Sequence, residues 1–176
     1  MQNETRKSIP KPFLKFKKIS RNLLISYPST SQIVIMGKTY ELNRFVEAQE
    51  STYNEALSEI KKGKKQSHWM WFIFPQIAGL GFSEYNVFYA IKNREEATQY
   101  LQHPVLGKRL IEISKAVLEI NGKTSNEIFG KPDERKLQSC MTLFAQITDS
   151  DPIFQQVLDK QYQGIKDEKT MQLLNN

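Results

Sequence analysis

Apolar residues recur at helical spacing over much of the chain, beginning near Leu42. Asn43 can cap a first helix, and Gly63 can end it near Lys62. Its apolar side consists of Phe45, Val46, Tyr53, Ala56, Leu57 and Ile60. The four glutamates that we expect on its solvent-facing side are Glu47, Glu50, Glu55 and Glu59. The pattern therefore predicts one amphipathic helix over residues 43–62.

A run of large apolar residues, from Trp69 to Phe74, interrupts this amphipathic pattern. Such a run is buried on most sides, and periodicity alone does not separate helix from strand there. We predict a short buried helix, because Ser67 can cap it and Pro75 restricts the backbone of Phe74. A buried strand is the alternative, since aromatic residues favour strands.

Capping residues and glycine or proline breaks divide the rest of the chain into further short helices. Ser83 is a natural N-cap, and two capping boxes are predicted, one from Asn93 to Glu96 and one from Thr124 to Glu127. The helices are expected near residues 83–91, 93–101, 103–120, 124–130, 132–147, 152–163 and 167–174. Because clean period-2 alternation is almost absent, we predict a single all-α domain of seven to nine short helices over residues 39–176.

Residues 1–38 differ from this domain in charge. They hold eight basic residues and one acidic residue, a net charge of +7, whereas residues 39–176 hold 17 basic and 18 acidic residues. We expect residues 1–38 to form a poorly ordered basic leader, with a targeting segment or an upstream extension as the alternatives. Because the domain itself is close to neutral, its charge argues against nucleic acid as a partner.

Composition also bears on membranes, metals and disulfides. No apolar run approaches the ~20 residues that a membrane helix requires, so we expect no membrane partner. Cys140 is the single cysteine, which excludes an intrachain disulfide and fits a reducing compartment. The two histidines lie far from it in the sequence, so we expect no metal site, and no motif indicates a cofactor. The oligomeric state stays open.

Polar side chains flank the tryptophan-rich run. An apolar wall with a few convergent polar groups is typical of a small-molecule pocket. The candidate ligand-binding residues are Lys65, Ser67, Trp69, Trp71, Gln76, His103, Asp133 and Lys136. His68 is the candidate catalytic residue, since an imidazole suits general acid–base chemistry. The hypothesis needs residues 65–76 and 133–142 to meet in space, which one sequence does not establish.

The residue types in this set favour one class of ligand. Lysine side chains suit a phosphate group, and indole faces suit a nucleobase or a sugar. The leading hypothesis is therefore binding or processing of a phosphorylated or nucleotide-like small molecule, with the existence of a reaction left open. The alternative is a protein-interaction module in which the tryptophan-rich run is purely core.

Several blocks of the sequence also match a known pattern. They are Arg44–Gln49, Ser67–Gln76, Gly79–Gly81 with Ser83, Tyr89–Ile91, Leu101–Gly107, Ile128–Gly130 and Lys136–Phe144. Together they resemble the uncharacterised family catalogued as domain of unknown function 1810, over about residues 42–174. The resemblance implies a small, cytoplasmic, α-helical domain and supplies no reaction. Some members carry the label calpastatin, but nothing in this sequence supports protease inhibition.

Overall fold

The computed structural model describes residues 39–175, and the predicted basic leader of residues 1–38 lies outside this range. The compact helical unit begins at Tyr40. Its elements are α1 (Asn43–Glu50), α2 (Tyr53–Lys61), α3 (Met70–Ile73), α4 (Glu84–Phe88), α5 (Arg94–Gln102), α6 (Leu106–Glu119), α7 (Ser125–Phe129), α8 (Asp133–Ala145), α9 (Ile153–Tyr162) and α10 (Glu168–Asn175). The all-α prediction is confirmed, because residues 39–175 contain ten helices and no strand.

The predicted helix over residues 43–62 is wrong in one respect, because the chain forms two helices there. α1 ends at Glu50 and α2 begins at Tyr53, with Ser51 and Thr52 between them. Hydroxyl side chains compete with the backbone for hydrogen bonds and so favour helix ends. Asn43 is also not the cap, since Leu42 precedes the first helical residue. The extra break gives ten helices in the described residues instead of seven to nine.

The prediction of a short buried helix in the tryptophan-rich run is confirmed. α3 is a single turn whose residues Met70, Phe72 and Ile73 are buried. The helix ends at Ile73, and the C-cap residue Phe74 donates its N–H to the Met70 carbonyl before Pro75. Ser67 does not cap this helix, because the preceding residue is Trp69 and no side chain caps it. Ser67 instead bonds to Glu59 of α2.

Capping chemistry defines most of the later helix starts. Ser83 accepts a hydrogen bond from the Asn86 N–H, as predicted. Thr124 and Glu127 form the full reciprocal capping box. Asn93 accepts from the Glu96 N–H, but the Glu96 carboxylate binds the Lys92 N–H and Arg44 and not the N–H of Asn93. The first predicted capping box is therefore only half formed, because Glu96 is drawn into a buried ion pair with α1.

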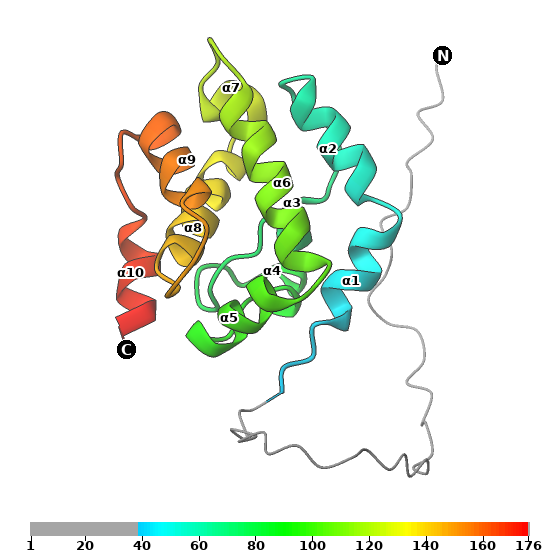
Figure 1. The fold of residues 1–176 in the computed structure, drawn as a ribbon, viewed down its shortest axis with the longest axis vertical. Coiled ribbons are helices and arrows are strands. Elements are labelled where there is room, and N and C mark those ends of the chain that lie inside the picture. The colour runs from blue at the N-terminus through cyan, green and yellow to red at the C-terminus, as the bar shows by residue number, and fades with distance from the viewer. Residues whose placement is uncertain (1–38, 176) are drawn as a thin grey trace. The chain divides into compact units, whose positions relative to one another are not determined.

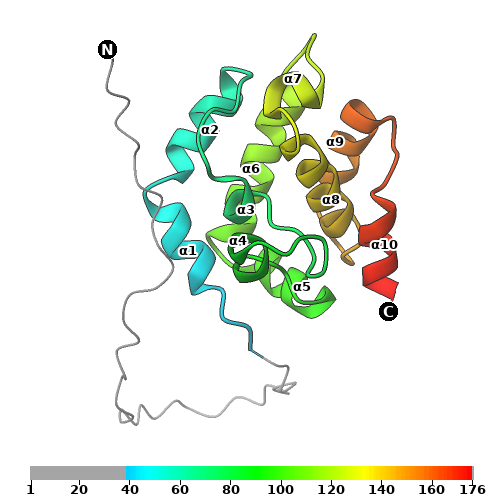
Figure 2. The same cartoon turned by 180° about the vertical axis from the view of Figure 1, so that it is seen from behind.

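The helices pack around α3. Figures 1 and 2 show α3 near the middle of the domain, behind α6 in the first view and in front of it in the second, with α4 below it in both. α6 packs against α2, α5 and α9, while α8 packs against α7, α9 and α10. A parallel bridge between Ile77 and Ile91 fixes the loop after Pro75 against the start of α5. Within residues 39–175 no helix has the length and hydrophobicity to cross a membrane.

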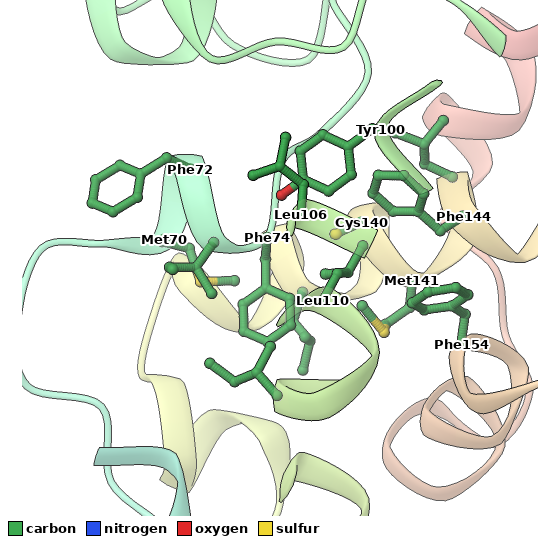
Figure 3. Close-up of a cluster of buried hydrophobic side chains, with 14 of the residues drawn as sticks. Met70, Phe72, Phe74, Tyr100, Leu106, Leu110, Cys140, Met141, Phe144 and Phe154 are labelled. Carbon is green, nitrogen blue, oxygen red and sulfur yellow. The ribbon is translucent and has the colours of Figure 1, made fainter. Parts of the chain in front are cut away.

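The core joins α3 to α6, α8 and α9. Figure 3 shows Met70 and Phe74 beside Leu110, with Met141, Phe144 and Phe154 farther along the same cluster. Cys140 lies inside this cluster, where burial raises the pKa of its thiol well above the ordinary value. This packing fixes the positions of the polar groups on both sides of the α3 turn.

Candidate functional site

A buried carboxylate organises the loop that leads into α3. Glu59 is 7% exposed, and it accepts hydrogen bonds from the backbone N–H groups of Gln66 and Ser67 and from the Ser67 hydroxyl. The indole N–H of Trp69 donates to the same carboxylate at 2.8 Å. Burial alone would raise the pKa of Glu59, but these hydrogen bonds hold it below its ordinary value. The expectation that Glu59 faces solvent is therefore wrong.

Lys65 joins this loop to the start of α8. Its backbone N–H donates to the Ile128 carbonyl at 2.7 Å. Its ammonium lies 2.8 Å from Asp133 Oδ2 and 2.7 Å from the Ser67 carbonyl oxygen. The structure thus brings residues 65–76 and 133–142 together, although 68 positions separate Lys65 from Asp133 in the sequence.

Asp133 lies between two ammonium groups. Lys136 Nζ is 2.7 Å from Asp133 Oδ1, on the oxygen that Lys65 does not contact. The three side chains are only 8% (Lys65), 17% (Asp133) and 17% (Lys136) exposed. Burial would raise the pKa of Asp133, but hydrogen bonds from Lys136 and Lys65 hold it below the ordinary value. We call these three residues the lysine–aspartate cluster.

Trp71 lies beside the lysine–aspartate cluster. The Lys136 ammonium is 4.7 Å from the centre of the Trp71 ring, within cation–π distance. Tyr85 of α4 stacks on the same indole, with ring centres 5.2 Å apart and ring planes 29° apart. The indole nitrogen of Trp71 is buried and has no hydrogen-bond partner within the described part of the chain. Trp71 is therefore a donor without an acceptor.

Trp69 has a different role from Trp71. It is fully buried, and its ring packs edge-on against Phe129 at 6.4 Å between ring centres. Its indole N–H is satisfied by Glu59, and the Lys65 ammonium lies 5.0 Å from its ring. Trp69 is thus a core residue that supports Lys65 and offers no open face.

The remaining predicted site residues are not all at the cluster. His68 is exposed, next to Ser67 in the chain. His103 lies between α5 and α6 instead, where its Nδ1 accepts from the backbone N–H groups of Val105 and Leu106. Gln76 is half-buried, and its backbone carbonyl accepts a hydrogen bond from the Ile91 N–H.

Gln76 also lines a small hollow of about 120 Å³ formed by the glycine turn. Gly79, Gly81 and Asn86 are among its other walls. A Cβ atom on Gly81 would lie 2.4 Å from the Asn86 amide nitrogen, so a larger residue there would have to displace the Asn86 side chain. The hollow is lined separately from the lysine–aspartate cluster.

Two residues of the site escaped the sequence analysis. The sequence indicates the burial of Glu59 only weakly, through its position next to Ile60 at the edge of the apolar stripe of α2. Tyr85 gave none, since its stacking on Trp71 depends on the path of the chain between α3 and α4. Among residues 39–175, no three His, Cys, Asp or Glu side chains gather as metal ligands.

Comparison with known proteins places the domain in a family. The model of the family described as Protein of unknown function (DUF1810) matches residues 39–174. The crystal structure of the conserved hypothetical protein Rv1873 from Mycobacterium tuberculosis is 47% identical, with a TM-score of 0.75. That match covers 77% of this chain and 96% of the other. No curated protein gives a significant match. The chain belongs to the DUF1810 family, in agreement with the resemblance found in its sequence.

Proposed function

We propose that the lysine–aspartate cluster, together with Trp71, binds a small anionic molecule, phosphorylated or nucleotide-like. The observation that carries this proposal is the charge balance of the cluster. Two ammonium groups that are 8% and 17% exposed share the single carboxylate of Asp133. Buried charges are normally paired, so a net charge of +1 in this position favours an additional anion.

The hydrogen-bond inventory points to the same ligand class. A lysine ammonium has three N–H donors. Lys65 uses two of them, on Asp133 and the Ser67 carbonyl, and Lys136 uses one, on Asp133. The indole N–H of Trp71 has no acceptor among the described residues. Several donors without acceptors suit an oxyanion, because phosphate oxygens only accept when fully ionised.

The neighbouring groups suggest how the rest of such a ligand is held. The stack of Trp71 on Tyr85 offers aromatic surface that a nucleobase or sugar would extend. His68 is exposed and lies three positions after Lys65 in the sequence. We propose that it contacts the ligand from the solvent side and transfers a proton if a reaction occurs. Ser67 and Trp69 act by holding Lys65 in place, through Glu59 and the Ser67 carbonyl. The single free thiol fits a cytoplasmic location for this activity.

A thermal-shift screen of the full chain tests the proposal. The panel holds inorganic phosphate, nucleotides, sugar phosphates and nicotinamide metabolites. A ligand at 100 times its Kd stabilises the fold by about 2.7 kcal/mol, which such a screen detects. Lys136→Met and His68→Ala are expected to weaken the shift, whereas the exposed control Lys166→Met retains it. A shift that survives Lys136→Met unchanged contradicts binding at the cluster.

A second function is favoured by one surface feature. Phe82 is 88% exposed, Val87 65% and Phe88 41%, so three large apolar side chains face solvent at and just before α4. Grouped apolar exposure of this kind marks interaction sites. If the domain is an interaction module, Phe82→Ser abolishes capture of a protein partner and leaves ligand-induced thermal shifts intact. A screen without any hit, combined with such capture, would favour this function.

A further inference from the structure

The outer face of α6 carries a regular pattern of charge. Figure 1 views this face, with α2 on one side of α6 and α9 on the other. Four exposed residues spaced for a single helix face lie along it, Lys108, Glu112, Lys115 and Glu119. We call them the α6 charge stripe. The stripe is separate from the site of the proposed function, none of whose residues belongs to α6.

The α6 charge stripe borders a groove between α6 and the end of α2. The groove has a volume of about 410 Å³, and Lys61 forms its far wall. Ile111 and Ala116 are its apolar members. Ile111 is half-buried and Ala116 is buried, so the groove has a small apolar floor and a charged rim.

Three of the four charges of the stripe form no ion pair within residues 39–175, and the fourth, Glu112, holds a hydrogen bond. Glu112 accepts a hydrogen bond of 2.6 Å from the Tyr53 hydroxyl, which fixes its position. Within residues 39–175, neither Lys108, Lys115 nor Glu119 takes part in an ion pair. These side chains remain available to a partner.

The order of charges identifies the partner. Lys108 and Glu119 are equally far from the midpoint of the stripe, which lies between Ile113 and Ser114. Glu112 and Lys115 are likewise equidistant from that point, and so are the apolar Ile111 and Ala116. Turning the helix end for end about this midpoint places each lysine where a glutamate stood. The stripe is thus complementary to its own antiparallel copy.

We propose that two copies of this chain associate through α6, antiparallel about a two-fold axis at the middle of the helix. Lys108 of each copy faces Glu119 of the other, and Glu112 faces Lys115. Such an isologous interface is the commonest form of homodimer. The small side chain of Ala116 lets the two helices approach closely beside Ile111. Because the paired charges lie at the surface, added salt weakens the association.

Charge reversal tests this dimer in the full chain. Sedimentation velocity over a concentration series up to about 1 mM measures the association of the wild type. Lys108→Glu places two glutamates opposite each other in both halves of the interface, and Glu119→Lys places two lysines there. Each variant alone is expected to associate at least about tenfold more weakly than the wild type.

The mixture of the two variants is the decisive sample. In a heterodimer of Lys108→Glu with Glu119→Lys, every facing pair again has opposite charges, so association recovers to the wild-type level. Both positions are exposed, and circular dichroism verifies that each variant keeps its helices. A wild type that stays monomeric over the whole series overturns the proposal. So does a wild type whose dimer persists unchanged in both single variants, because that dimer uses another surface.

Discussion

The indole N–H of Trp69 donates a 2.8 Å hydrogen bond to the carboxylate of Glu59, and both side chains are buried. This bond joins α2 to the entrance of α3. The same carboxylate binds two backbone N–H groups of the loop before α3 and the Ser67 hydroxyl. The loop is thereby fixed where Lys65 reaches Asp133, so the geometry of the lysine–aspartate cluster depends on Glu59.

Glu59→Gln is expected to destabilise the domain by about 2–4 kcal/mol, because an amide replaces an ionised acceptor and turns an N–H group toward donors. Urea unfolding followed by tryptophan fluorescence measures this loss. Glu55→Gln, on the exposed side of the same helix, is the matched control and should change stability little. Equal effects of the two substitutions would contradict the structural role of Glu59.

The contribution of Glu59 is expected to depend on pH. Its pKa is lower in the folded state than the ordinary 4.5, so folding favours the ionised form. The stabilisation is therefore complete above about pH 4.5 and declines as the pH falls through the lowered folded pKa. The difference in unfolding free energy between wild type and Glu59→Gln should therefore shrink as the pH falls from about 6 to about 3, roughly the range in which a glutamate titrates. A constant difference across this range would count against the assignment.

Asp133→Asn is expected to cost about 2–3 kcal/mol, because it leaves two largely buried ammonium groups without a carboxylate. Removing one of the two charges should relieve this cost. The double variant Asp133→Asn with Lys136→Met is therefore expected to be more stable than Asp133→Asn alone. Thermal unfolding of the four proteins forms a double-mutant cycle. Additive effects would show that Lys136 and Asp133 do not interact.

For the substitution Gly107→Ala, the structure predicts whether the domain becomes more or less stable. Within a helix this substitution ordinarily stabilises by about 1 kcal/mol. Here an added Cβ would lie 1.9 Å from the Leu101 carbonyl oxygen, a backbone atom of α5. We expect destabilisation of about 2 kcal/mol or more, since the backbone cannot turn aside as a side chain would. Denaturant unfolding distinguishes the two signs, and a stabilised Gly107→Ala protein would contradict the close packing of α5 on α6.

The features predicted from the sequence are those that depend on neighbouring residues. The Ser83 cap, the Thr124–Glu127 capping box and the single buried turn after Trp69 follow from local spacing, and the structure contains all three. The break at Ser51 escaped prediction because the apolar stripe continues across it in α2.

The tertiary contacts of the site could not be predicted from the sequence. Glu59 resembled an ordinary surface glutamate, because its four donors come from a loop whose path is set by packing. The approach of Lys65 to Asp133 depends on α7, whose Ile128 carbonyl receives the Lys65 N–H. The composition of the tryptophan-rich run indicated where a site would lie, and only the fold shows which of its groups lack partners.

The most direct test of anion binding uses the two indole N–H signals of the uniformly ¹⁵N-labelled full chain, since the chain has two tryptophans. Trp71→Phe assigns them. Titration with inorganic phosphate, and then with the best ligand from the thermal-shift screen, is expected to move the Trp71 signal, whose N–H lacks an acceptor, and to leave the Glu59-bound Trp69 signal in place. Lys136→Met should abolish the movement. A Trp71 signal that stays fixed at saturating ligand, or one that moves equally in Lys136→Met, would contradict an anion site at the lysine–aspartate cluster.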